Sequence, residues 1–193
     1  MKNDGVRIFL LLVGVLALSG CTRACSSAIG YPPGDGSPLS SVAGDPNLNV
    51  DKDFQFPDGF PPDPGPAGKK TLVGIDADGD GLRDDVQRWI YARFPKDVRK
   101  RKALRQSAIY YQSGMAREVN ATNYLEASEQ GSRAISCILF TFSYEIQAHI
   151  EMEYVAAKVL NTHERTKRYL DNDRAYDGKV FDLKNWKLEE ACD

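Results

Sequence analysis

The chain has 193 residues, enough for one ordinary domain, and 42% of them are hydrophobic, which is enough to build a core. Its formal net charge is −2 and no aromatic-interleaved basic motif is present, so the composition argues against nucleic acid as a partner. Gly-x-Ser-x-Gly, His-Glu-x-x-His and a phosphate-cradling glycine loop are also missing from the sequence. These absences favour a protein that is not an enzyme.

Residues 1–20 have the pattern of a secretory signal peptide. Two basic residues precede an apolar run over residues 8–18, which is too short to span a bilayer as a helix. The junction that follows, Leu18-Ser19-Gly20-Cys21, resembles the lipobox of bacterial lipoproteins. This resemblance implies that residues 1–20 are removed and that Cys21 carries lipid, which anchors the protein to a membrane. An ordinary signal peptide with a nearby cysteine is the alternative.

Secretion bears on both location and cysteine chemistry. Thr22 follows the lipobox cysteine, and by resemblance to bacterial lipoproteins the absence of aspartate there implies sorting to the outer membrane. Thiols outside the cytoplasm tend to be oxidised. Cys137 lies in an apolar helical segment and Cys192 in the C-terminal tail, so we expect them to form a disulfide that staples the tail to the core. Cys25 then stays free or pairs between molecules.

The region after the lipobox has a linker-like composition. Nine of the ten prolines lie between residues 31 and 68, a region that also holds many glycines. Such a stretch buries too little apolar surface to offset its chain entropy. We therefore expect residues 21–70 to be a disordered, Pro/Gly-rich tether and the folded domain to begin near Thr71. Its large apolar residues dock on the domain or, alternatively, on a partner: Phe54, Phe56 and Phe60.

Residues 71–193 have the periodicity of an all-α domain, a small helical bundle, with no alternating strand pattern. Asp84 and Gln87 fit a capping box at the start of the first helix, and Thr162 is a cap for the last one. The expected helices cover residues 84–94, a second segment with Pro95 in its first turn, residues 123–160 and a fourth segment that ends before Gly178.

Two further features belong to the long third segment and to the tail. Gly131 is a potential interruption of the third helix. The apolar residues of this segment form one stripe: Leu125, Ile135, Ile138, Leu139, Phe142 and Ile146. The tail is expected to return toward the core through Phe181, Leu183 and Trp186.

The stretch IDADGDGLRDDVQRWI places carboxylates at alternate positions followed by a glycine, the pattern with which a loop wraps a hard cation. Residues 76–87 resemble the calcium loops of EF-hands and, more closely, those of dockerin-like and thrombospondin-type repeats. The resemblance implies calcium as the ligand, with oxygens from Asp76, Asp78, Asp80 and Asp84, the Leu82 carbonyl and Gln87. Gln87 stands where an EF-hand has glutamate, so we expect weak binding. The alternative is a polar turn with a helix cap.

Two other groups of charged residues are candidate binding or catalytic sites. A basic cluster contains Arg93, Lys96, Arg99, Lys100, Arg101, Lys102 and Arg105. It is interpreted as a solvated helix end that pairs in part with the acidic loop, and an anionic partner is the alternative. Glu145, His149 and Glu153 are spaced i, i+4 and i+8. We expect helix-stabilising polar pairs there, although this spacing also suits a transition metal or acid–base chemistry.

Together these patterns predict a bacterial envelope lipoprotein at the outer membrane that acts as a calcium-stabilised, non-enzymatic binding or structural module. Its expected partners are the membrane, through the lipid, and an envelope protein or an anionic glycan. An immunity-type lipoprotein that blocks a periplasmic toxin is the second hypothesis, and an enzyme acting on peptidoglycan is the third.

Overall fold

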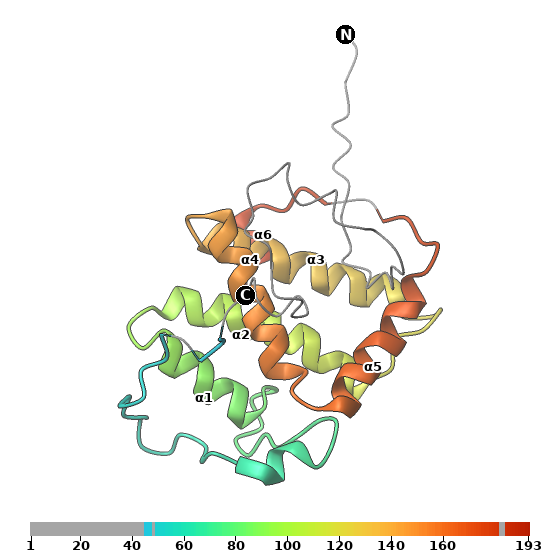
Figure 1. Ribbon diagram of the computed structural model, residues 1–193. Helices are drawn as coiled ribbons and strands as arrows, with labels where there is room; N and C mark the ends of the chain where they lie inside the picture. Colours follow the sequence, from blue (N-terminus) through green and yellow to red (C-terminus); the bar gives the residue numbers. More distant parts are fainter. Residues whose placement is uncertain (1–44, 48, 182–183) are drawn as a thin grey trace, which may run out of the picture. The chain divides into compact units, whose positions relative to one another are not determined.

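The computed structural model describes residues 45–47, 49–181 and 184–193, and its elements over these residues are all helical (Figure 1). The prediction of a small all-α bundle is therefore confirmed. The predicted signal peptide, Cys21, Thr22 and Cys25 lie outside the described residues. The helices are α1 (Asp84–Arg93), α2 (Val98–Ala116), α3 (Tyr124–Thr141), α4 (Glu145–Val159), α5 (His163–Asp173) and α6 (Leu188–Ala191), with 3-10 turns η2 (Gly65–Lys69) and η3 (Arg174–Tyr176).

Helix α2 is the central element, because α1, α3, α4 and α5 all pack against it. Helix α6 packs on α3. Among the described residues, no helix combines the length and the apolar character that crossing a membrane requires.

Two helix starts test the predicted caps. The Thr162 hydroxyl accepts a hydrogen bond from the Arg165 backbone N–H at 3.2 Å, so the predicted cap of α5 is confirmed. The prediction that Pro95 lies in the first turn of the second helix is wrong. Asp97 caps α2 by accepting from the Lys100 N–H at 3.0 Å, and Pro95 lies in the turn before it.

The predicted helix over residues 123–160 is two helices. Its chain leaves the helical conformation at Phe142, which has φ −97° and ψ 130°. The Phe142 ring is buried and lies 5.8 Å from that of Phe94, so tertiary packing fixes the break. Gly131 does not interrupt α3. A Cβ at this position would lie 2.9 Å from the ring of Tyr110, so the glycine makes room for a side chain of α2.

The predicted apolar stripe is buried only in part. Ile138 and Phe142 belong to the core, because their exposed fractions are 0% and 4%. The remaining members of the stripe are exposed: Leu125, Ile135, Leu139 and Ile146. The predicted stripe requires one continuous helix. Because the helix breaks between α3 and α4, the two helices turn different faces toward α2.

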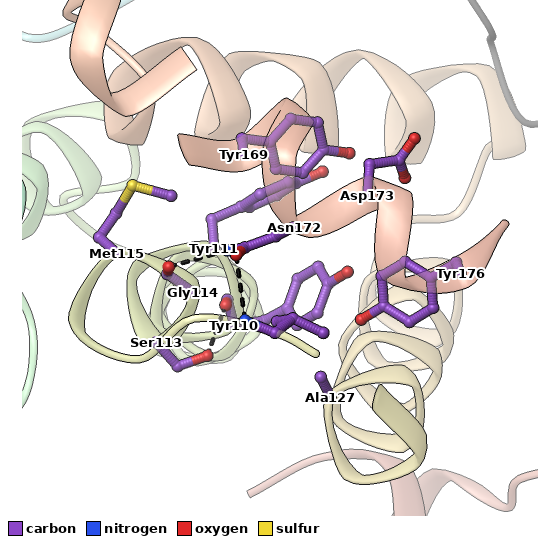
Figure 2. A pocket seen from close by; sticks show the side chains of 11 residues that line it. Tyr110, Tyr111, Ser113, Gly114, Met115, Ala127, Tyr169, Asn172, Asp173 and Tyr176 are labelled. Carbon is purple, nitrogen blue, oxygen red and sulfur yellow. Dashed lines mark hydrogen bonds between the residues drawn. The ribbon is translucent and has the colours of Figure 1, made fainter. Parts of the chain in front are cut away.

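Helix α5 is attached to α2 through a buried asparagine. The Asn172 side chain donates to the Gly114 carbonyl at 2.8 Å and accepts from the Val119 N–H at 3.0 Å (Figure 2). A Cβ on Gly114 would lie 2.9 Å from the Asn172 amide nitrogen, so this close approach requires the glycine.

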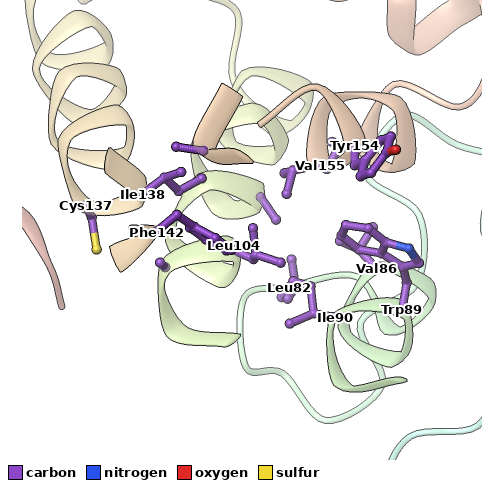
Figure 3. Close-up of a cluster of buried hydrophobic side chains, with 14 of the residues drawn as sticks. Leu82, Val86, Trp89, Ile90, Leu104, Cys137, Ile138, Phe142, Tyr154 and Val155 are labelled. Carbon is purple, nitrogen blue, oxygen red and sulfur yellow. The ribbon is translucent and has the colours of Figure 1, made fainter. Parts of the chain in front are cut away.

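The hydrophobic core lies where α1, α2, α3 and α4 meet (Figure 3). Each helix contributes side chains that are at most 1% exposed: Val86 and Ile90 from α1, Leu104 from α2, Ile138 from α3 and Val155 from α4. Burying an aliphatic side chain of this size contributes about 1.5–3 kcal/mol relative to leaving it in water.

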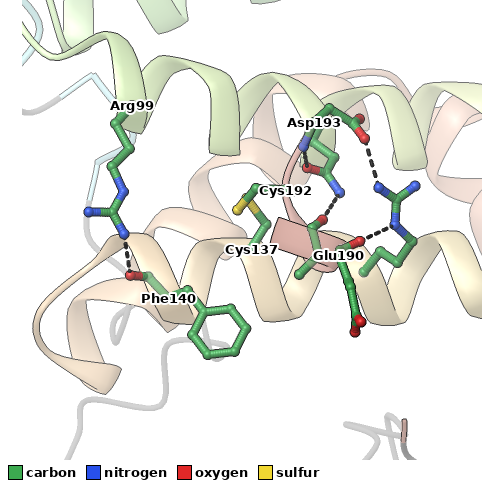
Figure 4. Close-up of a disulfide and its surroundings, with 9 residues drawn as sticks. Arg99, Cys137, Phe140, Glu190, Cys192 and Asp193 are labelled. Atoms are coloured by element: carbon green, nitrogen blue, oxygen red, sulfur yellow. Dashed lines mark hydrogen bonds and ion pairs between the residues drawn. A yellow bond between two sulfur atoms is a disulfide. The ribbon is translucent and has the colours of Figure 1, made fainter. Parts of the chain in front are cut away.

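The C-terminal tail is joined to α3 by the Cys137–Cys192 disulfide, which confirms the predicted pairing (Figure 4). The Gln106 side chain of α2 also donates to the Ala191 carbonyl at 2.6 Å. Trp186 donates from its indole N–H to the Ser132 hydroxyl at 2.9 Å, so this part of the tail returns to the bundle as expected. Leu183 lies outside the described residues.

The segment over residues 45–70 packs on the helices, which differs from the expected boundary at Thr71. The Trp89 indole donates to the Pro46 carbonyl at 2.9 Å, and the Arg88 guanidinium donates to the Pro61 carbonyl at 2.8 Å. The Asp51 N–H donates to the free Ala92 carbonyl near the end of α1 at 2.9 Å. The composition predicted a linker, but these three hydrogen bonds with α1 attach the segment to the domain.

The phenylalanine cluster docks on the domain, as expected. Phe60 lies 4.7 Å from the ring of Tyr91, and the Arg88 guanidinium lies 3.7 Å from the centroid of the Phe56 ring. Phe54 completes the cluster at 5.0 Å from Phe56. Both contacted side chains, Tyr91 and Arg88, belong to α1.

Candidate metal centre

The acidic loop folds into a closed ring before α1. Its two ends are joined by a hydrogen bond from the Asp84 N–H to the Ile75 carbonyl at 2.9 Å. Asp76 accepts backbone hydrogen bonds across the ring, from Asp80 at 3.1 Å and from Gly81 at 2.9 Å. Gly81 has φ +87°, a left-handed conformation that glycine adopts without a Cβ clash.

Three of the predicted ligands are brought together. One carboxylate oxygen from each of Asp76, Asp78 and Asp84 lies within 4.8 Å of the other two, so the three could hold a metal ion. Asp84 is 1% exposed, Asp76 is half-buried and Asp78 faces solvent. The group therefore has a buried side against α1 and an open side through which an ion can enter.

Asp80 is not a member of this group, although the loop pattern predicted it as a ligand. Its carboxylate accepts from the Leu82 N–H at 2.8 Å and from the Gln87 amide at 3.0 Å. Arg105 of α2 also lies 3.4 Å from the Asp80 carboxylate. The Asp80 carboxylate is thus paired with Arg105, a residue of another helix. The sequence of the loop alone could not reveal this partner. Leu82 places its side chain in the core at 1% exposure.

The predicted capping box is wrong. The N-cap of α1 is Arg83, and it makes no side-chain cap. The Asp84 carboxylate instead accepts from the Ala77 N–H at 3.0 Å, inside the loop. Gln87 also faces the loop, where its amide donates to Asp78 at 3.2 Å and to Asp80. Both side chains serve the loop instead of the helix start.

Gln87 carries an unpaired oxygen. The side chain is 7% exposed, and its Oε1 atom is buried with no hydrogen-bond partner in the described part of the chain. The two ends of an amide are assigned from their neighbours, and here the NH₂ end faces two carboxylates. With a cation among those carboxylates, rotating the amide would direct Oε1 to the ion. The donor set therefore fits a hard cation.

The local environment shifts the pKa values of Asp84 and Asp78 in opposite directions. Burial raises the pKa of Asp84, and the charges of Asp78 and Asp76 raise it further. The pKa of Asp78 is lowered, with the hydrogen bond from Gln87 as the main cause. Binding a divalent ion would reverse the repulsion at Asp84, because an opposite charge favours the ionised carboxylate.

Side chains from distant segments hold the ring in place. Gln112 of α2 donates to the Gly81 carbonyl at 3.1 Å and accepts from the Arg83 N–H at 3.0 Å. The Arg83 side chain is 0% exposed and donates to the Val159 carbonyl of α4 at 2.9 Å, and it pairs with Asp85 at 2.8 Å. Sequence reasoning missed Arg83 and Gln112, because partners 29 and 76 residues away leave no local pattern.

The Glu145, His149 and Glu153 series forms no comparable group. His149 and Glu145 lie 3.7 Å apart, with side chains 58% and 81% exposed. Among the described residues, the acidic loop holds the single group of three acidic, histidine or cysteine side chains close enough to share a metal ion. The arrangement is a polar pair on a helix surface, as expected.

The basic cluster is only partly a solvated helix end. Arg93 turns into the core toward Glu151, and Arg101 donates to the Phe94 and Pro95 carbonyls at 2.8 Å. Arg105 pairs with the acidic loop, as expected. A hollow of about 250 Å³ lies beside the loop and is lined by Asp80, Leu82, Gln87, Ile90, Tyr91, Val98, Arg101, Lys102 and Arg105.

No protein-family model, no curated protein and no solved structure matches this chain. Its function must therefore be argued from the side chains of the loop and of the surfaces around it.

Proposed function

We propose that this chain is a lipid-anchored protein of the bacterial envelope whose domain binds calcium through the acidic loop and acts as a non-enzymatic binding or structural module. The observation that carries the proposal is the gathering of three carboxylate oxygens within 4.8 Å, beside a buried amide oxygen that has no partner in the described residues. Calcium accepts six to eight oxygens in flexible geometry, whereas magnesium demands a tighter octahedron. A group of carboxylates with one side open to solvent therefore suits calcium better than magnesium.

Asp76, Asp78, Asp84 and, after rotation of its amide, Gln87 would hold the ion. Bound calcium would supply positive charge to the ring and neutralise the repulsion among these carboxylates. Asp84 lies in the first turn of α1, and α1 contacts α2, α4 and the segment before the loop. The proposed role of calcium is thus to fix the start of α1 and the packing that depends on it.

The anchor is proposed from the lipobox resemblance. Two or three acyl chains on Cys21 give an effectively permanent attachment, because each buried methylene contributes about 0.8 kcal/mol. The domain would then be held at the outer membrane, outside the cytoplasm, the setting of extracellular calcium modules with dissociation constants of roughly 10⁻⁴ to 10⁻³ M.

An anionic group of an envelope component, such as an acidic glycan, is the proposed partner of the hollow beside the loop. Lys102 is exposed there and makes no hydrogen bond or ion pair with any described residue. Arg101, whose guanidinium donates to neutral backbone carbonyls, and Tyr91 add a second positive charge and an aromatic face. Calcium in the ring would add further positive charge next to this surface.

Calcium is expected to raise the melting temperature of the full chain and a chelator to lower it. At free calcium a hundredfold above its dissociation constant, the gain is about 2.7 kcal/mol of unfolding free energy. Magnesium should give a smaller rise at equal concentration. Circular dichroism melts with chelator, calcium or magnesium measure this effect.

Two variants at the ring separate ion binding from a general salt effect. Asp78→Asn should remove most of the calcium-dependent rise, while Asp58→Asn, at an exposed position outside the ring, should keep it. Gln87→Glu should destabilise the calcium-free domain and tighten calcium binding, because it adds a carboxylate where EF-hands have one. Melting that ignores calcium between chelator and about 10 mM, above the range of extracellular loops, would contradict the proposal.

Cys21→Ala is expected to abolish lipid attachment. The variant should appear in the soluble fraction or accumulate as uncleaved precursor, because the lipobox cysteine both accepts the lipid and sets the cleavage site in lipoproteins. Fractionation, with mass spectrometry of the mature N-terminus, measures this. Cys25→Ser is the matched control and should stay membrane-bound. Normal processing and membrane fractionation of Cys21→Ala would show that the anchor is not this cysteine.

A further inference from the structure

A hollow lined by tyrosines lies between α2, α5 and the beginning of α3 (Figure 2). Its volume is about 40 Å³, and its walls include Tyr110, Tyr111, Tyr169, Tyr176 and Asp173. The Asn172 hydrogen bonds and the packing of Tyr110 against Gly131 hold two of its walls in place. The hollow is built from residues that neither the acidic loop nor the basic cluster uses.

Asn172 and Ser113 in the lining are hydrogen-bonded to α2, but the tyrosine hydroxyls and Asp173 have no such partner among the described residues. Two cations near Asp173 in sequence are engaged elsewhere. Lys167 pairs with Asp171 at 2.6 Å, and Arg174 pairs with the same carboxylate at 2.8 Å. No described cation, Arg168 included, forms an ion pair with Asp173, so this half-buried carboxylate lacks a cationic partner among the described residues.

The electrostatics of these groups agree with that geometry. Burial raises the pKa of Asp173, and the charge of Asp177 raises it further. Burial also raises the pKa of Tyr110, Tyr169 and Tyr176, and the charge of Asp173 contributes to each of these shifts. The side chains of Tyr110, Tyr169 and Tyr176 line the same hollow as Asp173. They stay protonated near neutral pH and can each offer an oxygen lone pair.

We propose that this tyrosine hollow binds a primary ammonium group, supplied by a small amine or by a lysine side chain of another protein. An ammonium has three donors and no acceptor, and the hollow offers a carboxylate, hydroxyl oxygens and aromatic rings, all of which attract a cation. A volume of about 40 Å³ exceeds the 10–15 Å³ that a water molecule requires, and it holds an ammonium with its first methylene. A trimethylammonium group is bulkier and has no hydrogen to donate.

This inference is independent of the calcium proposal, because none of the residues that line the hollow belongs to the loop. The test uses the full chain in detergent and isothermal titration calorimetry with four probes. Methylamine and Nα-acetyl-lysine methylamide represent the two sources of the ammonium group, while tetramethylammonium and methanol are the controls. We expect saturable binding of at least one ammonium probe in the millimolar range or tighter. Methylamine binding alone would indicate a small amine, and lysine-amide binding a protein partner.

Asp173→Asn should weaken amine binding at least tenfold, because hydrogen bonds to charged groups are worth about 1.5–3 kcal/mol. Tyr110→Phe keeps the ring that packs on Gly131 and removes one hydroxyl, so a several-fold loss is expected. Asp58→Asn is the matched control, since Asp58 is exposed and lines no part of the hollow, and it should bind as wild type.

Far-UV circular dichroism of each variant shows whether it is folded, and the tyrosine variant keeps the test decisive if Asp173→Asn unfolds. Three results would overturn the proposal. The first is that neither ammonium probe binds the wild type saturably. The second is that methanol or tetramethylammonium binds as tightly as the ammonium probes. The third is that Asp173→Asn and Tyr110→Phe both bind the ammonium probes as tightly as the wild type does.

Discussion

Glu151→Ala is expected to lower the unfolding free energy of the domain by about 3–5 kcal/mol, the cost of removing one partner of a buried ion pair. Both Arg93 and Glu151 are nearly inaccessible, with side chains 6% and 2% exposed. The guanidinium makes two parallel contacts with the carboxylate, at 2.6 and 2.7 Å. It also lies 4.7 Å from the centroid of the Tyr154 ring. Removing the carboxylate takes away the two charge-assisted hydrogen bonds that this buried guanidinium makes with it.

Urea unfolding followed by circular dichroism measures the loss. Glu153→Ala is the matched control, because Glu153 is an exposed residue of the same helix and surface substitutions usually change stability by less than about 0.5 kcal/mol. The double variant Arg93→Met with Glu151→Leu should recover part of the loss, since an apolar pair needs no desolvation of charge. An unfolding midpoint of Glu151→Ala equal to that of the wild type would show that the pair contributes nothing to stability.

The features that the sequence predicted correctly depend on short-range chemistry. The Thr162 cap acts over three residues, and the acidic loop gathers its carboxylates within nine. The Cys137–Cys192 pair is long-range, but the sequence has few cysteines, so residue type alone left few possible pairings. Residue type and spacing determine such features, so a single sequence suffices to predict them.

The errors concern residues whose roles are set by distant segments. The sequence suggests Gly131 as a potential interruption of the third helix, but the glycine makes room for a tyrosine of α2. Arg93 was assigned to a solvated cluster, and its partner Glu151 lies 58 residues further along the chain. Arg165 is fully buried and donates to the Gly68 carbonyl at 2.6 Å, 97 residues away. That contact is one reason why the segment before residue 71 is part of the domain. Sequence periodicity cannot show which helices will surround a charge.

The candidate site divides in the same way. The alternation of aspartates predicted the ring, and Asp76, Asp78 and Asp84 do meet there. Asp80 was expected to join them, but Arg105 of α2 and Gln87 occupy its carboxylate. The tyrosine hollow could not be anticipated, because its residues come from α2, α3, α5, η3 and a loop, and their spacing in the sequence has no motif.

Replacing both Cys137 and Cys192 with serine is expected to lower the unfolding free energy by about 4 kcal/mol. The two cysteines are 55 residues apart, and opening a loop of that length returns chain entropy of this size to the unfolded state. The native tail keeps other attachments, because Gln106 donates to the Ala191 carbonyl and Arg133 pairs with Asp193 at 2.8 Å. The loss should therefore come mainly from the unfolded chain, with the helical content of the folded domain unchanged.

Urea titrations of wild type and the double variant, each with and without a thiol reductant, separate the disulfide from the substitutions themselves. Reductant should shift the wild-type midpoint to that of the double variant, while the double variant itself should not respond. Cys25→Ser is the control and should match the wild type, because it leaves the Cys137–Cys192 bond intact. Wild-type protein made in a reducing cytoplasm should lack the bond and show the lower stability, and oxidation in the envelope should restore the difference. Equal midpoints for wild type and double variant under oxidising conditions would mean that the bond does not constrain the unfolded chain.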